Sequence, residues 1–345
     1  MDYEVLRAMN IDVENINPNE IRIFGNPAGV LPEKNSETRY DDLTEMAIFV
    51  SGAEDGRFDA GDYVLFYGQD PTCWKVDGSA NMKYERLRNP YSDSTYYYIC
   101  ADSGVEGLRV ASQPSADIEG STNVITQFPD FACHEEELLS PYSSGRTWYG
   151  EQLTSTDSVL HFQLILPYLV KNKPIDYKLV VLGRSLNGTI HYDFWANDNH
   201  LVADGTINKL SENTNSYGID KSRTGQLQSG SDTINFSFVL QPRVASHLLY
   251  LDYVELFCWR ELKRAGDLFA FRLRPDQLNH SNSAVWVRIC RTTIRFGMSA
   301  IRCGQSFRRA FSALIILCLV SAARQSGAIL LSRLRQPCRW FLCNL

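Results

Sequence analysis

Residues 55–68, DGRFDAGDYVLFYG, join an acidic turn to an unbroken run of β-branched and aromatic residues. The run at 63–67, YVLFY, has no charged or amide side chain on either face, which predicts a strand buried on both sides. Gly56 and Gly61 supply the positive φ angles that a tight connection needs before such a strand. We therefore expect residues 21–74 to be organised around this strand.

The acidic turn contains three aspartates, Asp55, Asp59 and Asp62, and it has two interpretations. Oxygen-rich loops with glycine can bind calcium, but an EF-hand loop carries acids at its first, third and fifth positions. Here the acids are four and three residues apart. A solvated turn between two strands is the favoured interpretation, and a calcium ion held by the three carboxylates is the alternative.

The distribution of charge divides the chain into an acidic body and a basic tail. The 345 residues have 34 Lys and Arg against 40 Asp and Glu, a net charge of −6. Asp276 is the last acid, and the 69 residues after it contain ten arginines and no lysine. Residues 1–276 therefore carry a net charge of −16, which argues against nucleic acid as a partner.

Nine cysteines are present, and none lies in a CxxC or Cys/His spacing that would suggest zinc. We predict neither a metal centre nor a cofactor. The start, MDYE, lacks the basic residues and apolar core of a signal peptide. This leaves two alternatives, a cytoplasmic protein or a sequence whose beginning is missing.

Residues 1–125 are predicted to form an amino-terminal β module. Short apolar runs at 21–24, 47–50, 63–67 and 96–100 are separated by turn sequences such as GNP at 25–27. One short helical turn is expected at 3–9, with Val5, Leu6 and Met9 on one side. The polar stretch at 111–123 is typical of a linker between domains.

Residues 126–270 are predicted to form a second β domain. Apolar residues alternate with polar ones at 233–240, 190–196 and 160–166, the period expected when one face of a strand is core and the other is water. Several such strands, with a polar insert at 211–231, indicate a jelly-roll-like β-sandwich. The predicted fold class is therefore all-β.

The tail, residues 271–345, is predicted to be disordered and to have no fold of its own. Its Arg, Cys, Ser and Leu bias is typical of out-of-frame translation. Reading residues 296–305, FGMSAIRCGQ, one base backward permits WDVSDPLRP, so we expect a frameshift between about residues 272 and 295. The apolar run at 311–323 spans only about 20 Å as a helix, too short for the ~30 Å core of a bilayer, so no transmembrane helix is predicted.

A family resemblance appears in the order of several segments: IRIFGNPAGVLPE (21–33), DDLTEMAIFV (41–50), DGRFDAGDYVLFYGQ (55–69), NPYSDSTYYYI (89–99), HEEELLSPYSSGRTWYGE (134–151) and LDYVELFCWREL (251–262). Together they resemble the front region of the type IX secretion system sortases, relatives of the gingipain-type cysteine peptidases of Bacteroidota. The likeness covers about residues 3–270. The readable WDV-x-x-P resembles what this family places just before its peptidase domain.

The resemblance implies a cysteine peptidase that removes carboxy-terminal sorting domains from secreted cargo and attaches the product to the cell surface. Implied partners are the secretion machinery and its cargo, and the implied location is the outer membrane. Of the two alternatives for the missing signal peptide, the resemblance favours a sequence whose beginning is absent. The chain is then the part that precedes the catalytic domain, and it is predicted to be inactive alone.

No residue is assigned a catalytic role. Cys133 and His134 are the one adjacent Cys/His pair, but neighbours on a strand point to opposite faces, whereas a thiolate and its base must converge on one point. The pattern of parallel strands and helices expected of a peptidase domain is also missing from this sequence. The remaining strand histidines, 161, 191, 200 and 247, are interpreted as structural.

A rival function is a carbohydrate-binding or structural surface β-sandwich without enzyme activity. Trp148 and Trp195, with Tyr149 and Tyr192, could form an aromatic platform for a sugar. Packing in the core or at a sheet edge is the favoured interpretation of these aromatics.

Overall fold

The computed structural model describes residues 1–26, 29–76, 84–113, 123–143, 147–197, 200–211, 214–241, 243–265, 269–274 and 277, and short strands beyond. Its elements are almost all strands, so the predicted all-β class is confirmed. The chain divides into two compact units. The first comprises Met1–Asn123, Gly266–Ala284 and Arg291–Leu345, and the second comprises Val124–Ala265 and Val285–Cys290.

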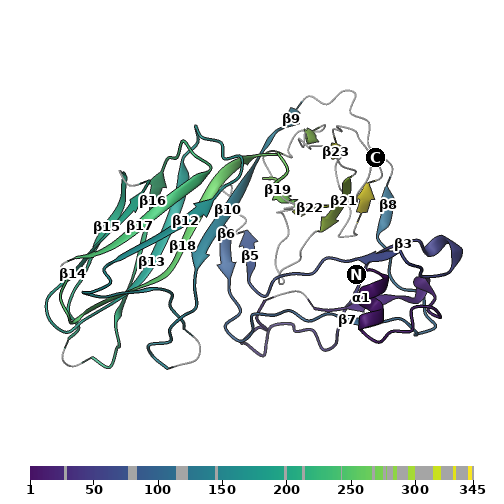
Figure 1. Ribbon diagram of the computed structural model, residues 1–345, viewed down its shortest axis with the longest axis horizontal. Helices are drawn as coiled ribbons and strands as arrows, with labels where there is room; N and C mark the ends of the chain where they lie inside the picture. Colours follow the sequence, from purple (N-terminus) through teal and green to yellow (C-terminus); the bar gives the residue numbers. More distant parts are fainter. Residues whose placement is uncertain are drawn as a thin grey trace. The chain divides into compact units, whose positions relative to one another are not determined.

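The second unit is a sandwich of two antiparallel sheets (Figure 1). One sheet has the order β10 (Gln127–Glu135), β18 (His247–Glu261), β13 (Ile175–Ser185) and β16 (Ile219–Leu227), with β11 (Gln152–Leu153) also paired to β18. The other has the order β12 (Val159–Ile165), β17 (Thr233–Gln241), β14 (Ile190–Ala196) and β15 (His200–Ile207). Apart from the short β11 and the β14–β15 hairpin, successive strands alternate between the two sheets, and the two sheet orders are those of an eight-stranded jelly roll.

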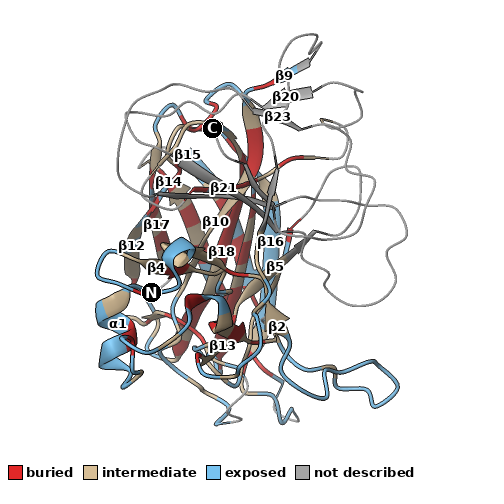
Figure 2. Ribbon diagram, turned by 90° about the vertical axis from the view of Figure 1, so that its right-hand side faces the viewer, coloured by how far each residue is buried: buried red, intermediate tan, exposed pale blue. Residues whose placement is uncertain are grey.

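Alternation of apolar and polar residues builds the core of this sandwich. On β17, Ile234, Phe236, Phe238 and Leu240 are all buried, and every second residue of β14 is buried in the same way. From the facing sheet, Leu179 and Leu256 join the same buried cluster. Figure 2 shows buried residues along β13, β17 and β18. The predicted strands at 160–166, 190–196 and 233–240 are therefore confirmed.

The polar insert predicted at 211–231 is in part wrong, because β16 occupies Ile219–Leu227. This strand lies at the edge of its sheet and pairs with β13 along nine residues. Most of its side chains are exposed, which removes the apolar alternation by which the other strands were recognised. Charged and polar side chains are usual on an edge strand because they discourage pairing with another chain.

The first unit contains several small sheets. β1 (Arg22–Phe24) lies between β2 (Glu45–Met46) and β7 (Tyr98–Cys100). β3 (Phe49–Ser51) pairs with β4 (Tyr63–Leu65), and β5 (Cys73–Val76) pairs with β6 (Tyr84–Leu87). One buried cluster joins the sheets of β1–β4 and β7 to the amino-terminal helix: Leu6, Val13, Ile21, Ile23, Ile48, Phe58, Val64 and Ala101.

The expectation of a strand buried on both sides at 63–67 is wrong. β4 is three residues long, and of these only Val64 is buried, while Tyr63 and Leu65 are half-buried. The strand belongs to a two-stranded sheet. It therefore does not have the position of a central strand in a parallel sheet, where other elements cover both faces. The apolar run at 63–67 fills the edge of a small core instead.

The short helix predicted at 3–9 is present as α1 (Tyr3–Ala8). The Asp2 carboxylate accepts a hydrogen bond from the Val5 amide at 3.0 Å and caps the helix. The predicted apolar side is wrong, because Leu6 is buried whereas Val5 and Met9 are exposed. Two 3-10 turns complete the helical content of the described residues, η1 (Pro18–Glu20) and η2 (Ala53–Asp55).

The tail contributes strands to the first unit. β21 (Ile294–Ser299), β22 (Leu314–Leu319) and β24 (Phe341–Cys343) share one sheet with β8 (Ala111–Gln113) and β19 (Phe269–Arg272). Further short strands are β9 (Asn123–Ile125), β20 (Ser283–Val285) and β23 (Ile329–Leu331). Most of the predicted linker, residues 114–122, lies outside the described residues. The disorder of the tail stays a prediction.

Among the described residues, no helix is long and apolar enough to cross a membrane. Part of the apolar run at 311–323 forms the strand β22.

Candidate functional site

The three aspartates of the acidic turn hold the turn itself. Asp55 accepts a hydrogen bond from the Arg57 amide at 2.9 Å, and Asp62 accepts one from the Asp59 amide at 2.8 Å. The Asp62 carboxylate lies directly over Gly52, where an added Cβ would meet Oδ1 at 1.7 Å. No group of three metal-ligating side chains is found in the described residues. Calcium binding by Asp55, Asp59 and Asp62 stays a prediction.

The structure places Trp148 and Trp195 on different parts of the sandwich. Trp148 precedes Tyr149, which packs against Leu182 and Tyr250 of the five-stranded sheet. Trp195 lies on β14 in the other sheet, between the buried residues Phe194 and Ala196, so its ring is on the outer side of that sheet. The two indoles therefore do not form one platform on a single sheet, and sugar binding by either one stays a prediction.

Cys133 and His134 lie on β10, and they face opposite sides of its sheet. His134 is opposite the buried Val254 of β18 and stacks on Phe162 of β12, with ring centroids 4.0 Å apart. Its Nε2 is 2.8 Å from Oε1 of Glu151. The imidazole is therefore engaged on the core-facing side, where it cannot take a proton from the thiol of Cys133.

A second ion pair lies on the same core-facing side of β10. Arg260 of β18 donates to the carboxylate of Asp130 and, through Nε, to the Pro167 carbonyl at 2.6 Å. Asp130 is directly opposite Cys258, whose thiol is buried. Burial raises the pKa of the Cys258 thiol to about 12, so it is protonated and unreactive at neutral pH. Inward-facing charges of this kind protect an edge strand from pairing with other chains.

Tyrosines form a hydrogen-bonded cluster beside the five-stranded sheet. Tyr149 donates to Asp220 at 2.8 Å, and the hydroxyls of Tyr217 and Tyr250 are 2.7 Å apart. Gln152 donates to the Tyr250 hydroxyl at 2.7 Å. Burial raises the pKa of both Tyr149 and Tyr250, so these phenols stay neutral and act as hydrogen-bonding groups.

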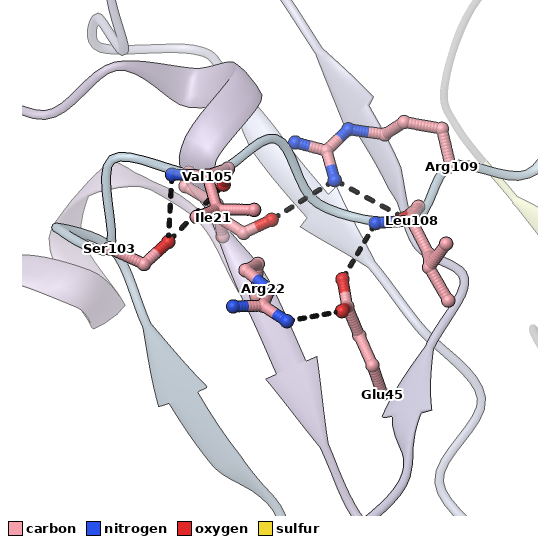
Figure 3. A network of polar contacts seen from close by, with 7 residues as sticks. All are labelled: Ile21, Arg22, Glu45, Ser103, Val105, Leu108 and Arg109. Carbon is pink, nitrogen blue, oxygen red and sulfur yellow. Dashed lines mark hydrogen bonds and ion pairs between the residues drawn. The ribbon is translucent and has the colours of Figure 1, made fainter.

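In the first unit a polar network ties the chain together around Glu45 (Figure 3). Arg22 donates to one Glu45 oxygen at 2.6 Å, and the Leu108 amide donates to the other at 2.7 Å. Arg109 donates to three carbonyls in the segment before β1, those of Pro18, Asn19 and Ile21, at 2.7–3.0 Å. These bonds join segments about 90 residues apart, so the network has a structural role.

The sequence did not predict either ion pair on β10 or the tyrosine cluster. Their members are too far apart in the chain for spacing to reveal them. One signal was present. Along β10, His134 and Asp130 point to the same side of the strand as Ala132 and Phe128. This places two polar side chains on a core-facing side, where they need hydrogen-bonding partners.

These geometries describe an all-β protein whose second unit is a jelly roll. Comparison with solved structures finds the same fold in PorU. The crystal structure of dimeric latent PorU from Porphyromonas gingivalis matches 96% of this chain with a TM-score of 0.68 and 18% sequence identity. The matched part is 31% of the PorU chain, so this chain spans about a third of that protein.

Two further structures match at scores too low to define a common fold. They are the carbohydrate-binding module CBM36 in complex with calcium and xylotriose (TM-score 0.25, 12% identity, 38% of this chain and 99% of that one) and the δ-endotoxin Cry8Ea1 from Bacillus thuringiensis (TM-score 0.23, 11% identity, 68% and 41%). No family model matches this chain, and no curated protein matches it.

Proposed function

We propose that this chain is the non-catalytic front part of a PorU-like type IX secretion sortase. The observation that carries the proposal is the fold shared with PorU over 96% of the chain. The ordered segments that resemble the sortase family also support it, and they include β1, β2, β4, most of β7, the residues after β10 and most of β18. In this role the two units precede and support a cysteine peptidase domain that is encoded downstream in the same gene.

The complete protein would cleave carboxy-terminal sorting domains from secreted cargo and attach the product to the cell surface. Its partners would then be cargo and components of the secretion machinery, and its location would be the outer membrane. Cys133 and His134 would not act as a catalytic pair in that reaction, because His134 is paired with Glu151 and Cys133 points to the opposite face. We propose in addition that a frameshift separates the body from the peptidase-coding sequence.

A corrected gene tests this proposal. With the frame restored between codons 272 and 295 and the downstream sequence included, the product should cleave a peptide that ends in a sorting domain. The 345-residue chain should not. A Cys133→Ser variant of the corrected protein should keep full activity. Cleavage by the 345-residue chain itself, or loss of cleavage in the Cys133→Ser variant with folding intact, would contradict the proposal.

A carbohydrate-binding module remains the rival function. Among the residues that the structure describes, no contact favours it, since Trp148 lies in the segment before β11 and Trp195 lies on β14.

A further inference from the structure

Residues 136–150 form an arm that leaves the five-stranded sheet after β10 and returns before β11. Within the arm, the amides of Leu138 and Leu139 donate to the Tyr149 carbonyl at 3.0 and 2.9 Å, and the Tyr149 amide donates to the Leu139 carbonyl at 2.7 Å. Residues 144–146 lie outside the described part of the chain. The two sides of the arm therefore form a narrow antiparallel ribbon.

His134 and Glu151 stand at the base of this arm, one immediately before it and one immediately after it. Their side chains are 16% and 22% exposed and are joined by the 2.8 Å contact between Nε2 and Oε1. Phe162 covers one face of the imidazole. Gly150 also binds the sheet, because its amide donates to the Leu251 carbonyl at 2.8 Å. The ion pair thus closes the loop of chain that contains the arm.

Farther along, the arm is held through aromatic contacts. The ring of Tyr142 lies 6.3 Å from that of Tyr149 and 5.4 Å from that of Tyr217. The arm also presents Leu138 and Leu139 to solvent, which are 56% and 39% exposed. Apart from Tyr149, which is buried against Leu182 and Tyr250, the arm buries little apolar surface, so its attachment depends on Tyr149, on these aromatic contacts and on its base.

The charged groups near the base can be taken element by element. On β10, Asp130 faces the core with His134 but is bound to Arg260 of β18. Opposite His134, β18 presents Val254, and β12 presents Phe162, whereas His161 contacts Ser237. The acids Glu135, Glu136 and Glu137 follow His134 in the chain. The carboxylate in contact with the imidazole is that of Glu151.

We propose that the His134–Glu151 pair is a protonation-controlled clamp on the arm. With a charged imidazole the contact is an ion pair, and charge-assisted hydrogen bonds are roughly twice as strong as neutral ones. When the imidazole loses its proton, the half-buried Glu151 carboxylate loses its counter-charge and the base of the arm loosens.

Hydrogen exchange on the full chain at about pH 5.5 and pH 8 tests the clamp. After correction for the intrinsic pH dependence of exchange, protection of the Leu138, Leu139 and Tyr149 amides should fall about fivefold at the higher pH, the difference between a charge-assisted and a neutral hydrogen bond. Burial is the largest single influence on Glu151 and raises its pKa, but the hydrogen bond and charge of His134 and a backbone hydrogen bond together lower that pKa overall, so the carboxylate stays ionised at the lower pH. Protection of the Phe236 amide on β17 should not change.

Two variants separate the clamp from a general effect of pH. His134→Gln and Glu151→Gln each keep a hydrogen-bonding side chain and remove one charge, so the arm should exchange at pH 5.5 as it does in the unmodified chain at pH 8. Glu151→Gln preserves the shape of the side chain, so it provides the test if His134→Gln does not fold. An arm whose protection is the same at both pH values, or whose pH dependence survives in Glu151→Gln, would overturn the proposal.

Discussion

The sandwich and the first unit reach a folded state by different means. In the sandwich, alternating side chains from both sheets meet in one large buried cluster that includes stacked Phe162, Phe236 and Phe194. The first unit has a much smaller buried cluster and relies on polar side chains that bind distant backbone groups. Burial of apolar area is thus the main source of stability in one unit, and hydrogen-bonded cross-links carry a larger share in the other.

This difference predicts where each unit is most easily damaged. A core substitution should be most harmful in the sandwich, whereas loss of a single polar cross-link or of a special glycine should be harmful in the first unit.

The largest effect is expected for Phe236→Ala. Phe236 is 1% exposed and lies 5.0 Å from the Phe194 ring and 5.2 Å from the Phe162 ring, centroid to centroid. Its truncation should lower the free energy of unfolding of the sandwich by about 3–5 kcal/mol, measured by urea denaturation. Ile165→Ala, at a residue that is 58% exposed, is the control and should change it by less than about 0.5 kcal/mol.

Arg109→Met should cost the first unit about 2 kcal/mol, because carbonyls of the segment before β1 lose their donors. Burial lowers the pKa of Arg109, with Glu45 opposing that shift, and the guanidinium stays charged. Denaturation followed by fluorescence of the first unit measures the loss. Arg57→Met removes an exposed guanidinium and is the matched control. Equal free energies of unfolding for the two variants would show that the hydrogen bonds of Arg109 do not stabilise the first unit.

Two glycines test the turn that contains η2. Gly52 and Gly56 both have positive φ, 83° and 78°, but an added Cβ meets the Asp62 carboxylate at Gly52 and meets nothing within 4 Å at Gly56. Gly56→Ala should cost about 1 kcal/mol through backbone strain alone. Gly52→Ala should cost about 2 kcal/mol, because Asp62 must also release the Asp59 amide. A comparison of thermal unfolding of the two variants is sufficient, and equal losses would argue against a role for Asp62.

The smallest effect concerns the pH dependence of the first unit. The hydrogen bond from Arg22 is the main cause that lowers the pKa of Glu45, and burial opposes it. A lowered carboxyl pKa stabilises the fold above the ordinary pKa of Glu, and this contribution disappears as pH falls through the native value. Between about pH 6 and pH 3, Glu45→Gln should therefore lose less stability than the unmodified chain, by up to about 1 kcal/mol. The exposed Glu14→Gln should titrate like the unmodified chain.

Sequence reasoning was most successful where a single strand carries its own evidence. The β17 pattern predicts both the strand and its buried face, because side chains alternate with a period of two. It failed at β16, whose edge position permits polar side chains on both faces, and at β4, whose apolar run lies in a two-stranded ribbon. Local sequence does not reveal how many neighbours a strand will have.

The polar contacts could not be predicted for a related reason. His134 and Glu151 are brought together by a sheet that pairs β10 and β11 with β18, more than 90 residues later in the chain. The adjacency of Cys133 and His134 suggested a comparison with catalytic pairs, and the strand geometry argued against it. Sequence reasoning could not identify Glu151 as the partner of His134, because their contact depends on the register of β10 and β11 with β18.

The proposal that this chain is the front part of a PorU-like sortase is tested most directly by the nucleotide sequence from codon 265 to well beyond codon 345. We expect a one-base shift between codons 272 and 295, after which the restored frame reads WDVSDPLRP and continues into a cysteine peptidase domain. A single intact frame through Leu345, with no peptidase-coding sequence downstream in any frame, would contradict the account.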